Sequence, residues 1–596
     1  MRLFAAWVTE APVRRWLLLV QSILLSAFMV CPAPSGAGSR VIGSPDGDIA
    51  KHVWTLWWMR KEALDGVSGL LTRYVNFPDG VHLYPIDPLD GLLGILVPLP
   101  PVVLANTLAF LHLTLLGLAA GWLGRLVSGS RLGGYVAGAM AQGSAFAAFT
   151  LHVGVGELRQ YWWLPLGLGC LVRASETGRW RWFAALGLTG AGATLSCFYH
   201  GAFLAVASAT WLVFHPPRSV RALGGYALAA ALAGAPSLAA AHVFASSYGG
   251  STALSSLSDA KTGSPTADDA GTAASLEDLY LPRSWARDRL TTVEKAYTGG
   301  RYLGLLAVLL AAIGVRAAPR RALPWVAVGV VGAVLSLGSV PGTGVIAGLF
   351  AHIGLPFAWL NSLLARVAEP VNFPARFLAI PMIAIPVLAS LATRWRWTAL
   401  LVPLAILEIQ AGDLVPWPRE TLSFPPVAGL SGRGAVLDLG VVLDDSHASR
   451  VLDMAVQMSL SSPTEAVPID RLDRWNDSGT RWARALPLAQ ALASRAPGPD
   501  RPAQQYREDL VLMRDRGFER ILLTHPSDGL DPQYDSLLTA LCGPPQRSEL
   551  ATLWTLPETT STPAELAQWT ADQTARIAAL VDADTPGHYP TSPALQ

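Results

Sequence analysis

Long apolar runs recur along the first two thirds of the chain and are absent after it. Several are shorter than the ~20 residues that a helix needs to cross a bilayer, so we expect their helices to extend past these limits. The pattern predicts an α-helical polytopic membrane protein with about eleven transmembrane helices. The segments are 13–31, 101–126, 133–151, 161–173, 182–198, 201–215, 222–242, 302–316, 323–338, 376–393 and 397–411.

A different alternation begins after Pro416-Trp417-Pro418. Short apolar strands are predicted at 435–439 and 520–524, and they alternate with segments of helical periodicity at 506–516 and 532–541. Strands that alternate with helices are typical of a small α/β domain. The predicted parts are therefore a transmembrane domain over 1–415, an α/β domain over 416–560, and a C-terminal helix and tail over 561–596.

Basic residues gather in short turns between the apolar segments. Cytoplasmic loops carry an excess of Lys and Arg, and six consecutive basic turns share one side if the N-terminus is cytoplasmic. The extracytoplasmic side then holds the outer loops 32–100, 243–300 and 339–375 and the α/β domain. Richness in Ala, Arg and Gly favours the inner membrane of a bacterium. The basic turns contain Arg14-Arg15, Arg125 and Arg131, 173–181, Arg218 and Arg221, 316–321, and 394–396.

The composition agrees with a membrane protein. The 596 residues are 51% apolar and 15% charged, against about 25% charged residues in an ordinary soluble protein. The net charge of +1 gives no reason to expect nucleic acid as a partner, and the four cysteines lack metal or redox spacing. The basic flank and apolar run at 13–31 also fit a secretory signal peptide, which stays open beside an uncleaved first helix.

Two carboxylates, Asp46 and Asp48, follow the first apolar segment and open a Trp-rich amphipathic run. His52 stands one helical turn after Asp48, and Trp57-Trp58 are expected to hold the loop to the bilayer surface. A carboxylate there suits a general base acting on a hydroxyl, and a second one suits a metal ion or the acceptor. Helix capping would explain both carboxylates equally well.

Further ionisable groups stand at the outer ends of predicted helices. Glu157 and Arg159 follow segment 133–151, and His200 lies between 182–198 and 201–215. Ionisable groups at membrane depth usually face a cavity. We therefore expect these three to line a cavity that receives a lipid phosphate and its sugar. Mutual pairing of Glu157 with Arg159, and an interfacial role for His200, are the alternatives.

Two arginines lie on the outer side against the positive-inside tendency. Arg301 follows Glu294 at one helix start, and Arg376 follows Glu369 at another. A guanidinium there is well placed to bind a phosphate with two parallel hydrogen bonds. The alternative is that each arginine forms a structural ion pair with the preceding glutamate.

Taken together, these short motifs resemble bacterial membrane glycosyltransferases of the GT-C superfamily, which use polyprenyl-phosphate-linked sugars. The resemblance covers most of the chain. One departure is Glu157, which stands where close relatives are expected to have His. The matching pieces are Gly47-Asp48 with Trp57-Trp58, Phe77-Pro78-Asp79-Gly80, Trp162-Trp163-Leu164-Pro165, Glu294 with Tyr302-Leu303-Gly304, Pro374-Ala375-Arg376-Phe377, and Arg516-Gly517-Phe518-Glu519-Arg520-Ile521-Leu522-Leu523.

The resemblance implies displacement at the anomeric carbon of a sugar carried by a polyprenyl phosphate. Asp48 would be the general base on a glycan, lipid or protein acceptor, with Asp46 as its partner. Arg376, with Arg301 and Arg159, would neutralise the leaving phosphate. A divalent metal on Asp46 and Asp48 is optional, because arginine can serve a monophosphate alone.

A second function remains open from the sequence. The chain could instead be a non-catalytic membrane transport or envelope-assembly protein whose extracytoplasmic tail binds a partner. Few ionisable residues lie within the cytoplasmic halves of the predicted helices. A transporter needs polar groups along its path, so this scarcity favours the enzyme.

Overall fold

The chain forms two compact units, which we describe separately. The first comprises 1–56 and 85–423, and the second comprises 57–84 and 424–596. The computed structural model describes residues 12–583 apart from 32–37, 46, 67–70, 73, 76, 79, 84, 249–272, 283, 285–298, 339–355, 365–372, 414, 416–418, 425–426, 428–429, 432–433, 440–446, 465–481, 494–502 and 526–531.

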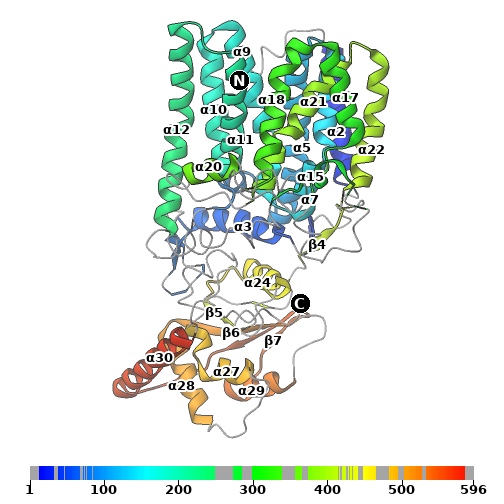
Figure 1. Ribbon diagram of the computed structural model, residues 1–596. Helices are drawn as coiled ribbons and strands as arrows, with labels where there is room; N and C mark the ends of the chain where they lie inside the picture. The colour runs from blue at the N-terminus through cyan, green and yellow to red at the C-terminus, as the bar shows by residue number, and fades with distance from the viewer. Residues whose placement is uncertain are drawn as a thin grey trace. The chain divides into compact units, whose positions relative to one another are not determined.

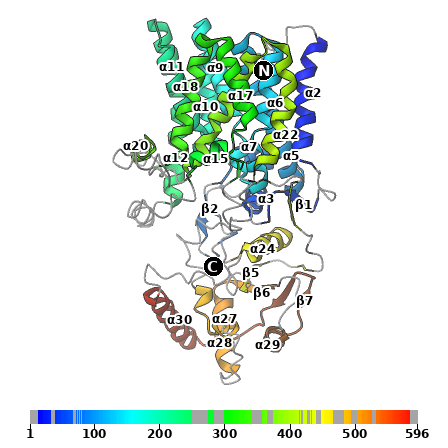
Figure 2. The ribbon, with the colours of Figure 1, turned by 45° about the vertical axis from the view of Figure 1, so that its right-hand side comes forward.

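The first unit is a bundle of helices that run alongside one another (Figure 1). Its centre is formed by α5 (Pro101–Ser128), α6 (Arg131–Gln142) and α21 (Pro381–Ala392), each of which contacts the other two. Around them lie α2 (Pro12–Met29), α9 (Trp163–Thr177), α10 (Trp180–Ser196), α11 (Phe198–Phe214), α12 (Val220–Tyr248), α17 (Leu305–Ala317), α18 (Pro319–Ser336) and α22 (Val402–Gly412). Turning the view keeps these helices side by side (Figure 2).

Short elements connect the bundle helices and carry most of the polar residues described below. They are α3 (Ile49–Asp65, of which 49–56 belong to this unit), α4 (Pro88–Leu96), α7 (Ala145–Val153), α8 (Gly156–Arg159), α15 (Leu276–Tyr280), α20 (Pro356–Leu364), η2 (Pro374–Ala379) and η3 (Arg396–Leu401).

Three helical stretches among the described residues are long and apolar enough to cross a membrane: Pro101–Ser128, Val220–Val243 and Pro374–Ala392. The predicted helical character of the apolar segments is therefore confirmed, but eleven spans are not supported. Several of the others are too short: α6 has 12 residues and α17 has 13. At 1.5 Å per residue, 12 residues reach about 18 Å, against the ~30 Å of a hydrocarbon core.

Local capping explains why one long apolar segment became two helices. The predicted segment 133–151 divides at Gly143, where α6 ends. The hydroxyl of Ser144 then caps α7 by accepting the Ala147 N–H. A serine that competes for backbone hydrogen bonds favours a helix start over a helix interior.

A buried glutamine joins three helices of the bundle. The Gln142 amide at the end of α6 donates to the Ser22 carbonyl and the Ser26 hydroxyl of α2, at 2.9 and 3.0 Å. It also donates to the Leu113 carbonyl of α5 at 3.0 Å. These hydrogen bonds offset the cost of burying the Gln142 amide. They also fix how α2, α5 and α6 lie against one another.

The segment after α2 and the segment after α22 pair in a two-stranded sheet of the first unit. β1 (Arg40–Ile42) pairs antiparallel with β4 (Thr421–Ser423). Beside it, the buried Arg419 side chain donates to the Met29 carbonyl at 3.1 Å and bonds to the Gln410 side chain. These contacts hold the chain after α2 to the chain after α22.

The second unit has a four-stranded sheet in the order β5-β6-β8-β7. β5 (Ala435–Asp438) is parallel to β6 (Phe518–Thr524), while β8 (Ala551–Thr555) is antiparallel to both β6 and β7 (Gln546–Arg547). Its helices are α24 (His447–Leu460), α27 (Pro487–Ala493), α28 (Ala503–Asp515), α29 (Pro532–Cys542) and α30 (Pro563–Ala583). Strands and helices thus alternate as expected from the sequence.

The second unit also includes a segment from the first predicted outer loop. Residues 57–84 contain the hairpin of β2 (Leu71–Thr72) and β3 (Val81–His82). The Phe77 ring packs edge-on against Phe518 at 5.2 Å, and the Phe77 N–H donates to the Thr464 carbonyl. Trp57 and Trp58 are buried rather than exposed to a bilayer surface, and Trp58 donates to Glu62. The expectation that they anchor the loop was therefore wrong.

Two glycines test how closely the bundle helices approach. A Cβ on Gly314 of α17 would lie 1.9 Å from the Leu388 carbonyl oxygen of α21, whereas one on Gly224 of α12 would meet nothing within 4 Å. We expect Gly314→Ala to destabilise the protein by about 1–3 kcal/mol through overpacking. Gly224→Ala should be neutral or stabilising by up to ~1 kcal/mol. Thermal unfolding in detergent measures both, and equal effects would contradict this packing.

Candidate functional site

The site begins where the loop before α3 docks on the link between α7 and α8. The Asp48 N–H donates to the Val153 carbonyl at 2.8 Å, and the Ser44 N–H donates to the His152 carbonyl. Only glycine fits at position 47, because a Cβ there would lie 2.1 Å from the Val153 oxygen. This close approach places the first turns of α3 against α8.

His52 and Glu157 form a mostly buried pair across that contact. Nε2 of His52 lies 3.0 Å from Oε2 of Glu157, and the side chains are 7% and 15% exposed. The Gly156 N–H also points at His52 Nε2, at 3.0 Å. One nitrogen cannot accept from Gly156 and donate to Glu157 at the same time. The position of the imidazole proton therefore decides which partner holds His52.

The surroundings of Glu157 favour its ionised form. Burial alone would raise the pKa of its carboxyl, but the hydrogen bond and charge of His52 and the charge of Arg376 lower that pKa to about 2. Glu157 is therefore an anion at neutral pH, and it carries no proton of its own to give.

Arg376 is a cation supported by aromatic rings. Its guanidinium carbon lies 4.7 Å from the centre of the Tyr199 ring and 4.4 Å from that of Phe373. The Phe373 N–H donates to the Tyr199 hydroxyl at 3.2 Å, which fixes the two rings relative to each other. Among the described residues no carboxylate pairs with Arg376 and none hydrogen-bonds to it. Its N–H edge is thus available to an anionic ligand.

Asp48 and His200 are two further predicted site residues on the same elements, since Asp48 immediately precedes α3 and His200 contacts α8. Asp48 is 27% exposed and forms an ion pair with Lys51 at 3.0 Å. His200 is fully buried, and its Nε2 donates to the Glu157 carbonyl oxygen at 2.8 Å. Asp48 is therefore the carboxylate here that solvent or a substrate can reach, while His200 holds the α8 backbone.

The predicted arginines differ in their surroundings. Arg159 is buried and donates to three backbone carbonyls, those of Thr150, Ile42 and Leu151. Arg301 is also buried, and it pairs with Asp278 at 3.1 Å. The structure thus brings Asp48, His52, Glu157, Arg159, His200 and Arg376 into one region, while Arg301 belongs to a separate ion pair next to α15. Asp46, Glu294 and Glu369 lie outside the described residues.

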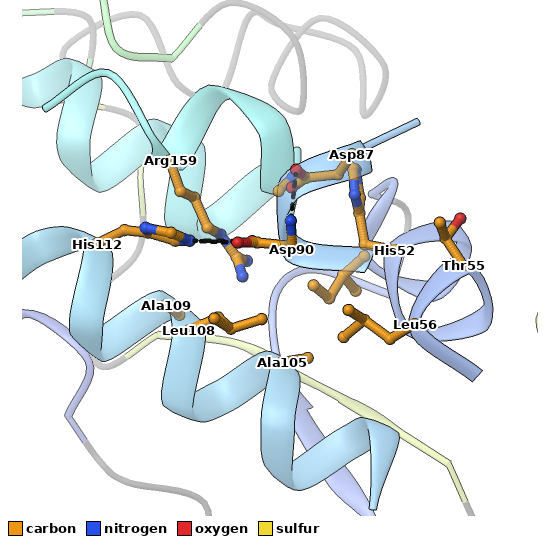
Figure 3. Close-up of a pocket in the computed structure, with 12 residues that line it drawn as sticks. His52, Thr55, Leu56, Asp87, Asp90, Ala105, Leu108, Ala109, His112 and Arg159 are labelled. Carbon is orange, nitrogen blue, oxygen red and sulfur yellow. Dashed lines mark hydrogen bonds and ion pairs between the residues drawn. The ribbon is translucent and has the colours of Figure 1, made fainter. Parts of the chain in front are cut away.

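A network of buried polar groups adjoins the pair (Figure 3). The Trp162 indole N–H donates to His112 Nδ1 at 3.2 Å, so His112 Nε2 carries the proton and donates to Asp90 at 2.9 Å. The Gln160 amide donates to Asp87 at 2.8 Å and accepts the Ser196 hydroxyl at 2.8 Å. Asp90 therefore accepts a hydrogen bond from His112, and its neighbour Asp87 accepts one from the Gln160 amide.

Sequence reasoning missed this network. Asp87-Pro88-Leu89-Asp90 reads as an ordinary helix start, and Asp87 does cap α4 by accepting the Asp90 N–H at 3.4 Å. The remaining signal was His112, a lone histidine inside a long apolar helix. An ionisable residue there needs a buried partner, but nothing in the sequence says that this partner is Asp90.

Asp87 is the carboxyl group whose surroundings favour the protonated form. Burial raises the pKa of Asp87 well above its ordinary value, and the negative charges of Asp90 and Glu157 raise it further. No group of three or more His, Cys, Asp or Glu residues within the described part of the chain is arranged to hold a metal ion.

No protein-family model matches this chain, and no curated protein sequence is significantly similar to it.

Asp87 should make stability fall with rising pH. The unfolded state loses the Asp87 proton above the ordinary pKa of 3.8 while the folded state keeps it, so folding weakens by about 1.4 kcal/mol per pH unit through this group. Asp87→Asn keeps the cap and the bond from Gln160. We expect its stability relative to wild type to rise as the pH increases above about 4, measured by unfolding at each pH.

The other titratable or charged groups around Asp87 are His52, Asp90, His112, Glu157, Arg159 and the buried Cys197. Glu176→Gln, at an exposed ion pair with Arg173, is the control and should keep the wild-type pH profile. A stability difference between Asp87→Asn and wild type that does not change with pH would contradict a proton on Asp87.

Proposed function

We propose that the protein is a membrane glycosyltransferase of the GT-C kind, which transfers a sugar from a polyprenyl-phosphate donor to an acceptor on the extracytoplasmic side. The proposal is supported by the apolar helices, by the motifs that resemble this superfamily, and by the polar site on α3, α8, α11 and η2. The transfer needs a cation for the leaving phosphate and a carboxylate for the acceptor hydroxyl.

One observation carries the proposal. Arg376 has no carboxylate partner among the described residues and is held between two aromatic rings close to the ionised Glu157. A buried structural arginine normally has a carboxylate, as Arg301 has Asp278. Within the described part of the chain the contacts of this guanidinium are to ring faces, and its N–H donors suit a planar or tetrahedral anion. A lipid monophosphate has that chemistry.

The roles follow from accessibility. Asp48 is the partly exposed carboxylate and would take the proton of the acceptor hydroxyl, with the Lys51 ammonium beside it. Arg376 would bind the donor phosphate and neutralise the charge that grows on it as the sugar leaves. Arg159, engaged by backbone carbonyls, would contribute its charge rather than a direct contact.

The proposed topology uses the basic turns of the sequence. The N-terminus would lie in the cytoplasm of a bacterial cell, the site at the outer face of the inner membrane, and the second unit outside the cytoplasm. With this topology the site and the acceptor are on the same side.

A transport or envelope-assembly role is the second candidate. The observation that favours it is the buried carboxyl pair of Asp87 and Asp90, because protonatable carboxyls inside a helical bundle also occur in proton-coupled transporters. Such a protein would move its substrate without changing it, so chemical analysis of the products separates the two functions.

Binding of the donor phosphate should depend on Arg376. Arg376→Gln removes the charge while retaining a side chain of similar length. We expect it to weaken binding of a polyprenyl monophosphate to the purified protein by about 10- to 100-fold, the worth of a charged hydrogen bond. Native mass spectrometry or calorimetry in detergent measures this affinity. Arg173→Gln, at an exposed arginine, is the matched control, and equal affinities of the two variants would exclude the phosphate role.

Turnover should depend on Asp48. Asp48→Asn retains size and hydrogen bonding but cannot accept a proton. With polyprenyl-phosphate sugars and cell-envelope acceptors, we expect it to lower the rate of sugar transfer by about 10²- to 10⁴-fold while leaving donor binding unchanged. Normal transfer by this variant, at wild-type protein levels, would remove the enzymatic role of Asp48.

A further inference from the structure

Glu157 and Arg376 carry opposite charges and contact two consecutive residues of α11. The centre of the Tyr199 ring lies 4.7 Å from the guanidinium carbon of Arg376. The next residue, His200, bonds through Nε2 to the Glu157 carbonyl oxygen at 2.8 Å. Arg376 is also one of the charges that favour the ionised form of Glu157. No ion pair joins the two side chains in the part of the chain that the structure describes, so they are neighbours that do not pair.

The Glu157 carboxylate also lacks a hydrogen-bond donor. Its Oε2 atom is buried and has no hydrogen-bond partner. His52 Nε2 lies 3.0 Å from that oxygen, but this nitrogen accepts the Gly156 N–H at 3.0 Å. The Glu157 side chain is 15% exposed, and the terminal torsion of a glutamate is soft enough to turn either oxygen towards a donor. An acceptor without a donor is costly, so a donor group of a bound ligand would stabilise this carboxylate.

The interior beside His52 is too small for such a ligand. The cavity there has a volume of about 20 Å³ and holds at most one water molecule (Figure 3). Glu157 is not among the residues that line it. A ligand as large as a sugar must therefore meet Glu157 outside this cavity, next to Arg376, the other positive neighbour of that carboxylate.

A cation and an anion that lie close together without pairing favour a ligand that has an anionic group and a hydroxyl group. A phosphate accepts hydrogen bonds from a guanidinium, and a carboxylate accepts one from a hydroxyl. A bare phosphate would satisfy Arg376 but would be repelled by Glu157. A sugar phosphate has both groups a few bonds apart, so each side chain meets the group that it binds. The two charges together therefore distinguish a sugar phosphate from the phosphate alone.

We propose that Glu157 determines specificity by accepting a hydrogen bond from a hydroxyl of the donor sugar while Arg376 binds the phosphate. The inference rests on the proposed function, and it narrows the donor class to phosphates of sugars that keep a free hydroxyl near the anomeric carbon. It also separates donor from product. Transfer leaves a polyprenyl phosphate without that hydroxyl, so the remaining phosphate faces an unsatisfied carboxylate and dissociates more readily.

Equilibrium binding to the purified full-length protein in detergent, without an acceptor, tests this preference. The probes are polyprenyl monophosphate and the same lipid phosphate carrying glucose, mannose or ribose. We expect the wild type to bind at least one of the sugar phosphates about tenfold more tightly than the bare phosphate, which is the worth of a hydrogen bond to a charged group. This comparison needs no variant, so it does not depend on the folding of one.

Glu157→Gln retains the size of the side chain and removes its charge. We expect this variant to bind the bare phosphate about threefold or more tightly than the wild type does, because the repulsion is gone. It should bind the preferred sugar phosphate about tenfold more weakly, because a hydrogen bond to a neutral amide is weaker than one to a carboxylate. Glu176→Gln, the same change at an exposed ion pair with Arg173, is the matched control and should keep the wild-type preference.

Two results would overturn the role of Glu157. One is a wild type that binds the bare phosphate as tightly as every sugar phosphate, and the other is a Glu157→Gln variant that changes both affinities by the same factor. Arg376→Gln reports on the proposed function instead, because it should weaken binding of every probe. If Arg376→Gln changes no affinity, the phosphate site itself is wrong. If it weakens all of them while Glu157→Gln shows no discrimination, only the specificity role fails.

Discussion

The polar site depends on a close backbone contact between two distant parts of the chain. The loop before α3 approaches the link between α7 and α8 so tightly that Gly47 has no room for a Cβ. The Asp48 N–H bonds to the Val153 carbonyl, and the Gly156 N–H reaches His52 across 104 positions of sequence. Without this contact the imidazole of His52 would not meet Glu157, and the cavity behind them would lose one wall. Backbone geometry therefore sets the chemistry of the side chains.

The structure stabilises Arg301, Arg159 and the partly buried Arg376 in three ways. Arg301 pairs with Asp278, Arg159 relies on backbone carbonyls, and Arg376 is held by the faces of two rings. A carboxylate partner occupies the N–H groups of the guanidinium, so they cannot bind a ligand. Ring faces contact the plane of the guanidinium and leave its N–H edge accessible to a ligand. This difference makes Arg376 the arginine for an anionic ligand, although the sequence pattern treats Arg301 and Arg376 alike.

The sequence predicts the local features well and the long-range ones poorly. The helical nature of the apolar segments and the alternation in the C-terminal part follow from periodicity, which is a local property. The number of spans does not, because Ser144 begins a new helix inside a run that reads as continuous. Hydropathy averages over such a capping residue, and so it does not show the break between α6 and α7.

The site was predicted only in part, because a sequence pattern indicates local features and not which distant residues meet. The spacing of Asp48 and His52 marks one helix face, and Glu157, His200 and Arg376 were recognised as ionisable groups at helix ends. Their common location follows from tertiary packing, and so does the separate partner of Arg301. The Asp87–Asp90–His112 network could not be found from the sequence. His112 is 22 positions away from Asp90, and Asp87 and Asp90 resemble an ordinary helix start.

The contact at Gly47 also has a consequence for recognising related chains. Most side chains of the site could be replaced by others of similar charge without moving the backbone, but Gly47 is fixed by the Val153 oxygen and Gly156 by the His52 ring, 2.7 Å from its would-be Cβ. A relative that shares this geometry must therefore keep a glycine before the aspartate that corresponds to Asp48 and another before the glutamate, whatever else has diverged. The pattern Gly-Asp followed by His four positions on, with a distant Gly-Glu, is a steric signature that sequence searches can use.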